Sequence, residues 1–159
     1  MGILRRDEPD QTPNEFWQEI EEKHGGKVRF HTFVRFIGRS QSSLENLPGL
    51  LYIINNVAHF EDFEKDNMLM RLINRKSKYT KTEFSFPLST VEKVQSVSKN
   101  QAVNCITGIV AGKDIKAMGG IARLLFSPVY HVLFDDGSSI FFEQVMDEKK
   151  FLKELKKIE

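Results

Sequence analysis

The sequence predicts a mainly β, α+β domain, in which a set of antiparallel strands is preceded by one amphipathic helix and followed by another. Three observations lead to this prediction. Apolar and polar residues alternate in several short stretches, which is the period of a half-buried strand. Two pairs of these stretches are joined by residues typical of tight hairpin turns. The first and last periodic segments repeat their apolar residues every three or four positions, which is the period of a helix.

One domain accounts for nearly the whole chain. The sequence has 159 residues, close to the size of one ordinary domain. Residues 1–11 are polar and charged without periodicity, and we expect them to form a flexible tail. No linker divides the remainder, so residues 12–159 are predicted to fold as a single domain.

The first periodic segment predicts a helix over residues 12–25. Thr12 can cap it, Pro13 suits the first helical position, and Glu15 can complete a capping box. Gly25 and its following glycine end the helix. The side chains that share its apolar face are Phe16, Trp17 and Ile20.

From residue 27 the period changes to two, which predicts a long strand over residues 27–39. The apolar face of this strand carries Val28, Phe30, Val34 and Phe36. The opposite face is basic, although two apolar residues, Phe33 and Ile37, also fall on it. The basic side chains of that face are Lys27, Arg29, His31, Arg35 and Arg39.

A hairpin is predicted next, because the apolar residues 50–54 and 57–60 flank Asn55-Asn56. Asparagine tolerates the left-handed conformations of a tight turn. Met68–Ile73 and Glu83–Leu88 suggest two more strands.

The C-terminal part predicts a second hairpin and a helix. Residues 130–134 and 139–142 flank Asp135-Asp136-Gly137, and Asp-Gly is a strong hairpin signal. Asp147 can then cap a helix over residues 147–158. Its apolar face carries Phe151, Leu152, Leu155 and Ile158.

The secondary structure of two segments is ambiguous in the sequence. Residues 90–97 place valine at every third position, which fits either a helical turn or a strand. Residues 99–128 mix glycines with small and apolar residues, which indicates an inserted loop or irregular strands. We favour an internal pair of strands; the alternative is an apolar loop that touches a membrane or a partner. Its large apolar side chains include Met118, Leu124, Leu125 and Phe126.

This order of elements resembles the pleckstrin-homology-like (PH-like) superfold, and within it the GRAM and bacterial PH-like branches. Three stretches are similar to that family: residues 49–60, with the first hairpin; residues 86–94, with a strand that runs into a polar turn; and Tyr130–Leu155, with the last hairpin and the helix. The resemblance implies an antiparallel split barrel capped by the C-terminal helix, here with an extra N-terminal helix. It also implies a non-catalytic module that presents loops to phosphoinositide headgroups, peptides or protein partners.

Composition and motifs exclude several classes of function. The chain has 23 basic and 22 acidic residues, which argues against a nucleic-acid-binding protein. Cys105 is the single cysteine and has no partner base marked in the sequence, and the four histidines lack metal-ligand spacing. The stretch 108–114 differs from a phosphate-binding loop, since its glycines are too close and Asp114 replaces the required Ser or Thr. We therefore expect no enzyme, no cofactor and no metal.

The candidate site is the basic face of the first predicted strand together with a basic run at residues 75–81. Clustered Lys and Arg side chains hold phosphate through charge-assisted hydrogen bonds. The alternative is a solvated sheet face whose charges are paired with acids such as Glu61, Asp62 and Glu64. The candidate anion- or lipid-binding residues are Lys27, Arg29, Arg35, Arg39, Arg75, Lys76 and Lys78.

Three functions remain as hypotheses. The first is a module that docks to a protein partner or to an anionic membrane lipid through its loops and the basic face. The second is a protein–protein adaptor without a lipid role, and the third is a small-molecule-binding barrel. Because charged residues precede any apolar run at the N-terminus, and no apolar stretch reaches the length of a membrane span, we expect a cytoplasmic protein with peripheral membrane contact at most.

Overall fold

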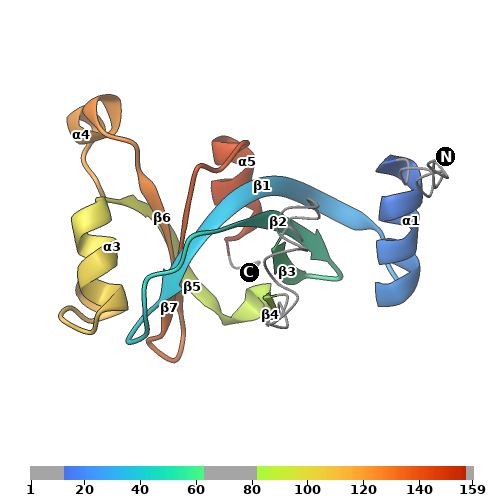
Figure 1. Cartoon of the computed structure of the whole chain (residues 1–159), viewed down its shortest axis with the longest axis horizontal. Coiled ribbons are helices and arrows are strands. Elements are labelled where there is room, and N and C mark those ends of the chain that lie inside the picture. The colour runs from blue at the N-terminus through green and yellow to red at the C-terminus, as the bar shows by residue number, and fades with distance from the viewer. Residues whose placement is uncertain (1–12, 63–81, 157–159) are drawn as a thin grey trace, which may run out of the picture.

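A computed structural model of the chain describes residues 13–62 and 82–156. It is an α+β structure built on one seven-stranded antiparallel sheet (Figure 1). Its strands are β1 (Val28–Arg39), β2 (Leu47–Ile54), β3 (Val57–Asp62), β4 (Glu83–Pro87), β5 (Val91–Val97), β6 (Val129–Phe134) and β7 (Ser139–Glu143). The helices are α1 (Pro13–His24), α3 (Lys99–Ile106), α4 (Gly120–Leu125) and α5 (Glu148–Glu154), with short 3-10 turns η2 (Leu88–Thr90) and η3 (Gly112–Asp114).

The strand order is β4-β3-β2-β1-β7-β6-β5. The long strand β1 joins the two halves of the sheet, because residues 28–36 pair with β2 and residues 35–39 pair with β7. A bulge between Phe36 and Gly38 lies at this change of partner, and Gly38 has a φ of 147°, which favours glycine. In the described part of the chain no ladder joins β4 to β5, so the sheet is not closed into a barrel.

The main core lies between the inner faces of the two halves, and α5 packs into it through Phe151 and Leu155, both fully buried. Alternate residues of β1 supply the first part of this core, as the two-residue period predicts. Every strand contributes side chains to this core, and β5 does so through its first residue. The buried strand residues of the core are Phe30, Val34, Phe36, Leu51, Ile53, Ala58, Phe60, Phe86, Val91, Tyr130, Val132, Ile140 and Phe142.

Each half of the sheet also carries a helix on its outer face. Ile20 of α1 packs on Leu50, Tyr52 and Ile54 of β2. On the other half, α3 packs Ala102, Cys105 and Ile106 against side chains that include Ile37, Val97, Val129 and Phe141. Figure 1 shows α1 and α3 at opposite ends of the molecule, with the sheet and α5 between them.

Most predicted elements are confirmed. Helix α1 ends at His24, and the amide of the following Gly25 donates to the carbonyl oxygen of Glu21 at 2.8 Å, while Thr12 lies outside the described residues. Both hairpins form, and Asn55 and Asn56 have φ values of 52° and 60°. The ambiguous segment is strand β5. The strand predicted at residues 68–73 lies outside the described residues.

Two predictions need correction. The internal pair of strands at residues 99–128 is wrong, because this segment contains α3, η3 and α4. The sequence held a signal for α3 in Ser98, whose side chain caps the helix by accepting from the amide of Gln101 at 3.3 Å. The described part of the last helix, α5, ends at Glu154 rather than 158, and Asp147 occupies the N-cap position without a side-chain hydrogen bond.

We expect Gly112→Ala to destabilise the fold by about 1–3 kcal/mol, because overpacked cores lose this much stability. A β-carbon at Gly112 would collide with Oγ of Ser139, which a buried hydrogen bond to His131 holds in place. Urea denaturation measures the effect, with Gly120→Ala as the control because nothing lies within 4 Å of its β-carbon position. Equal unfolding free energies for the two variants would contradict this packing.

Candidate functional site

The described basic residues of the candidate site do not gather in one place. Lys27 forms an ion pair with Glu21 at 3.1 Å. Arg29 pairs with Glu154 of α5 at 2.9 Å and donates to the side-chain oxygen of Asn56 at 2.7 Å. Both cations therefore already have an anionic partner within the chain.

The other two described candidates, Arg35 and Arg39, have different surroundings. Arg35 donates to the side-chain oxygen of Asn46 at 2.8 Å. Arg39, at the end of β1, places its guanidinium 4.4 Å from the centroid of the Phe84 ring. Among the described residues the guanidinium of Arg39 takes part in no ion pair or hydrogen bond, so it is a cation held by aromatic rings alone.

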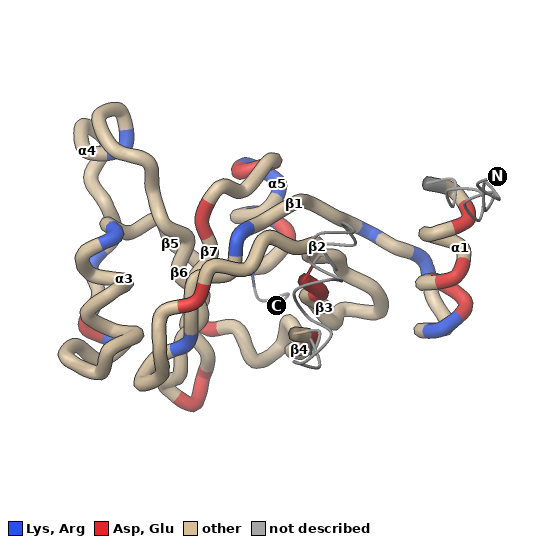
Figure 2. Tube along the Cα trace, viewed as in Figure 1, with Lys and Arg blue, Asp and Glu red and all other residues tan. Residues whose placement is uncertain are grey.

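Bulges in β1 explain why the basic residues are dispersed. The register shifts between Val28 and Phe30 and again between Phe36 and Gly38, and each shift changes which face the following side chains occupy. Figure 2 shows the basic positions spread along the whole strand. Arg75, Lys76 and Lys78 lie outside the described residues, so the predicted anion-binding role of the full set stays a prediction.

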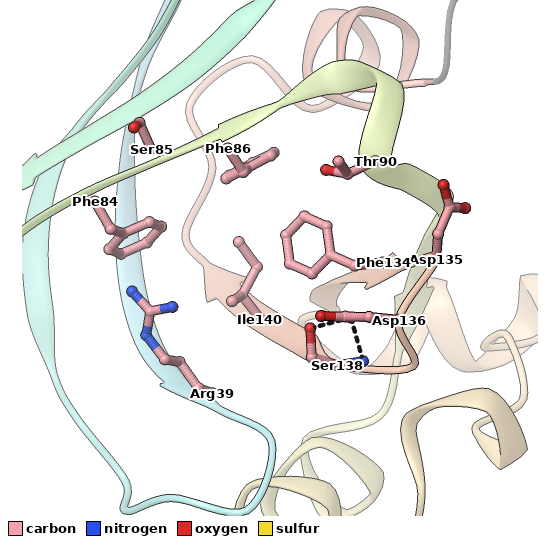
Figure 3. A pocket seen from close by; sticks show the side chains of 10 residues that line it. All are labelled: Arg39, Phe84, Ser85, Phe86, Thr90, Phe134, Asp135, Asp136, Ser138 and Ile140. Atoms are coloured by element: carbon pink, nitrogen blue, oxygen red, sulfur yellow. Dashed lines mark hydrogen bonds between the residues drawn. The ribbon is translucent and has the colours of Figure 1, made fainter.

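Arg39 lies at the mouth of a cavity of about 320 Å³ (Figure 3). This cavity opens where β4 and β5 fail to pair, so its walls come from β1, β4, the β4–β5 turn and the β6–β7 hairpin. Its lining consists of Arg39, Phe84, Ser85, Phe86, Thr90, Phe134, Asp135, Asp136, Ser138 and Ile140.

Opposite charges lie on two sides of this cavity. Figure 3 shows Arg39 beside Phe84 on one side, Asp135 and Asp136 on the other, and Ile140 and Phe134 between them. Asp136 accepts from the amide and the hydroxyl of Ser138 at 2.9 and 2.5 Å, and these bonds lower the pKa of its carboxyl group. The carboxylate of Asp136 is therefore charged at neutral pH.

A second unusual surface lies on α4. We call Ile121, Leu124, Leu125 and Phe126 the apolar tip. Their side chains are 77%, 87%, 71% and 66% exposed, and no residue of α4 is buried. Large apolar residues gathered on an exposed surface are a feature of interaction sites rather than of ordinary protein surface.

The chain holds the apolar tip in place from both sides. Arg123 of α4 pairs with Glu148 of α5 at 2.6 Å, and the amide of Met118 donates to the carbonyl of Ser96 in β5 at 2.7 Å.

Between α3 and α4 lies a groove of about 590 Å³. It is lined by Ser98, Lys99, Asn100, Gln101, Ala117, Met118, Gly119, Ala122, Phe126 and Ser127.

Sequence reasoning reached these surfaces only in part. The sequence shows that the stretch containing the apolar tip is apolar, but it does not predict the helix. Alternation along residues 27–39 identifies Arg39 as a basic strand residue, but it does not predict the aromatic and acidic lining around it. No signal in the sequence joins Arg39, Phe84 and Asp136, because they come together only through the sheet topology.

Comparisons with known proteins identify no family for this chain. No protein-family model matches the sequence, and no curated protein matches it. None of the described helices is both long and apolar enough to cross a membrane. Within residues 13–62 and 82–156, no three His, Cys, Asp or Glu side chains gather in an arrangement that could hold a metal ion.

Proposed function

We propose that this chain is a non-catalytic binding module with a PH-like split-barrel fold, and that it docks peripherally on an anionic lipid surface through the apolar tip. The fold part of the proposal is supported by the strand order, by the gap between β4 and β5, and by the C-terminal helix that packs into the core. The functional part rests on the apolar tip.

The exposure of the apolar tip is the observation that carries the proposal. Four large apolar side chains stay in water at a measurable cost, since moving one into an apolar medium stabilises by about 1.5–3 kcal/mol. In Figure 1, α4 lies at the outer end of the α3–β6 segment, so the tip can enter the headgroup–acyl boundary without any rearrangement of the sheet.

Charges near the tip favour an anionic surface. Lys149 and Lys150 are exposed and directly follow Glu148, the residue that is bound to Arg123 of α4. Each lysine close to an anionic membrane adds about 1 kcal/mol of attraction. Apolar insertion and lysine attraction together give two membrane signals, which a stable peripheral attachment requires.

Burial of the single cysteine supports a non-catalytic role. Cys105 is fully buried, and this burial raises the pKa of its thiol above its ordinary value. Its thiolate, the reactive form, is therefore disfavoured at neutral pH.

Vesicle flotation tests the docking proposal. We expect the protein to float with phosphatidylcholine vesicles that contain phosphatidylserine, and to float less at high salt. Leu124→Ser should lower the bound fraction about tenfold at limiting lipid, because it removes apolar area that enters the membrane. The matched control is Ile109→Ser: Ile109 is 74% exposed, but it follows α3 at the end away from α4 (Figure 1).

A protein–protein adaptor is the second candidate, and the groove between α3 and α4 favours it. A cavity of about 590 Å³ beside the apolar tip can receive a partner's side chains. Failure of the wild-type protein to bind anionic vesicles would overturn the lipid proposal and leave the adaptor. Equal losses for Leu124→Ser and Ile109→Ser would show that the tip is not the contact.

A further inference from the structure

Helix α1 is attached to the sheet by a small apolar contact of its own. The buried side chain of Ile20 packs on the outer face of β2, with Phe16 and Trp17 partly buried beside it. The buried residues of this contact are separate from the core that holds the two halves of the sheet together. The helix can therefore leave the sheet without opening that core.

The connection from α1 to β1 is a hinge of two glycines. Gly25 has a φ of 69°, and neither it nor Gly26 carries a β-carbon that would restrict a change of backbone angles. Glu21 of α1 and Lys27 form an ion pair across the hinge at 3.1 Å, so the charges on its two sides are balanced. Figure 1 shows α1 beyond the strands, at the end of the molecule away from α3.

Two histidines face each other across the contact. His24, in the last turn of α1, lies against His59 of β3, with the ring centroids 4.3 Å apart. Nε2 of His24 is also 3.3 Å from the hydroxyl oxygen of Tyr52, and this hydroxyl donates to Oε1 of Glu61 at 2.9 Å. Because a phenol has one hydrogen, His24 is the donor to Tyr52. This bond holds the ring of His24 beside that of His59.

We propose that the two histidines make α1 a pH-sensitive latch, in which the helix is docked on the sheet at neutral pH and is released in mildly acidic solution. Histidine is the side chain that ordinarily changes its charge in this range. Two protonated rings at 4.3 Å would repel each other, and the glycine hinge lets the helix move away. Release uncovers the apolar faces of both α1 and β2.

The charged groups around the pair favour the neutral form of His59. Burial, followed by the charge of His24, lowers the pKa of its ring. Glu61 of β3 acts in the opposite direction but is outweighed, and Lys23 of α1 adds to the lowering. Release removes the cover and the neighbouring ring, so the pKa of His59 returns towards its ordinary 6.5. The released form then binds the proton more readily, and the docked form loses stability as the pH falls below about 6.5.

Two other titratable side chains at the contact do not oppose docking in acid. Burial and the hydrogen bond to Glu61 raise the pKa of Tyr52, and Glu83 of β4 adds to this effect, so the phenol stays neutral. His31 of β1 lies against Trp17, with ring centroids 4.4 Å apart, and an aromatic face attracts a cation. Repulsion therefore belongs to the pair of His24 and His59.

Trp17 is the single tryptophan of the chain and lies in the contact, so its fluorescence reports whether α1 is docked. The experiment is a titration of the full-length protein from about pH 7.5 to about pH 5. We expect the emission maximum to move reversibly to longer wavelength, because release exposes the indole ring to water. In NMR spectra the amide signals of α1 should change over the same range, whereas those of β6 and β7 should keep their folded positions.

Three variants identify the groups responsible. His24→Gln keeps a side-chain N–H for Tyr52, and His59→Gln removes the opposite ring. Each should stay docked at about pH 7.5 and lower the ratio of released to docked helix at about pH 5.5 at least fivefold. His31→Gln is the matched control: it removes the titratable ring beside Trp17 but leaves the pair intact, so the shift in emission should persist. The two pair variants are made separately, so that one docked variant decides the question.

Four results would overturn the latch: constant emission until the whole chain unfolds, loss of the folded β6 and β7 signals together with those of α1, wild-type release in a docked His24→Gln or His59→Gln variant, or no release in His31→Gln. Vesicle flotation at neutral pH is independent of these results, because α1 and α4 lie at opposite ends of the molecule (Figure 1).

Discussion

Acidification from about pH 7 to about pH 4 is expected to lower the free energy of unfolding by about 3 kcal/mol through His131 alone. This residue of β6 is fully buried, and burial together with the nearby charge of Lys93 lowers the pKa of its ring to about 4 from an ordinary 6.5. The unfolded chain therefore binds a proton in a pH range in which the folded chain does not. Stability from this group is complete above pH 6.5 and is lost as the pH falls towards 4.

The hydrogen bonds of His131 explain why its neutral form is required. The side-chain amide nitrogen of Gln95 donates both to the carbonyl of Ile115 at 3.2 Å and to Nδ1 of His131 at 3.1 Å. Since an amide nitrogen only donates, Nδ1 must accept, and Nε2–H then donates to Oγ of Ser139 at 2.7 Å. A proton on Nδ1 would face the amide hydrogens of Gln95 and break the link to Ile115.

Urea denaturation across this pH range measures the effect. His131→Gln should lower stability at neutral pH and flatten its dependence on pH between about 6.5 and 4.5. Glu21 and Asp136, whose pKa values are lowered from 4.5 and 3.8, lose their contributions only below this range. A partly buried His59 has a lowered pKa and adds a smaller slope of the same sign. Identical slopes in His131→Gln and wild type would refute this explanation.

Local patterns predicted the elements whose partners are close in sequence. The alternation in β1, the Asn55-Asn56 turn and the Asp-Gly turn each depend on a few neighbouring residues, and each is found where it was expected. In residues 99–128 the glycines favour loops or irregular strands, yet the segment contains two helices. Ser98 and Gln101 have the spacing of a capping box, which predicts the first of them. Attention to that spacing would have located α3.

Long-range placement could not be predicted in the same way. The basic side chains at residues 27–39 keep one parity in the sequence, but they do not share one environment. Lys27 precedes β1 and pairs with α1, whereas Arg29, at the first bulge, pairs with α5 and Arg39, beyond the second, lines the cavity. A bulge depends on the neighbouring strands and leaves no periodic signal of its own. The cavity likewise exists because β4 and β5 do not pair, which is a property of the whole sheet.

The C-terminal helix gives rise to the other large expected effect, because it closes a core that the sheet leaves open. Phe151 of α5 is fully buried, with ring contacts to Tyr130 of β6 at 5.3 Å and Phe142 of β7 at 6.0 Å. Phe142 in turn contacts Phe36 and Phe60 of the other half. Phe151 therefore belongs to the cluster that holds the two halves together.

We expect Phe151→Ala to lower the free energy of unfolding by about 3–5 kcal/mol, the usual cost of removing a buried phenylalanine ring. Leu124→Ala, a smaller truncation at a side chain that is 87% exposed, should cost less than about 0.5 kcal/mol. Urea denaturation at neutral pH compares the two variants.

Hydrogen exchange then shows how the loss is distributed. Because Phe151 belongs to a core shared by both halves of the sheet, Phe151→Ala should speed exchange in β2 and β3 as well as in β6 and β7, the strands of its ring partners Tyr130 and Phe142. Faster exchange confined to α5 would mean that the sheet is stable without its helix. In that case the paired strands, and not the shared core, would hold the open sheet in its folded shape.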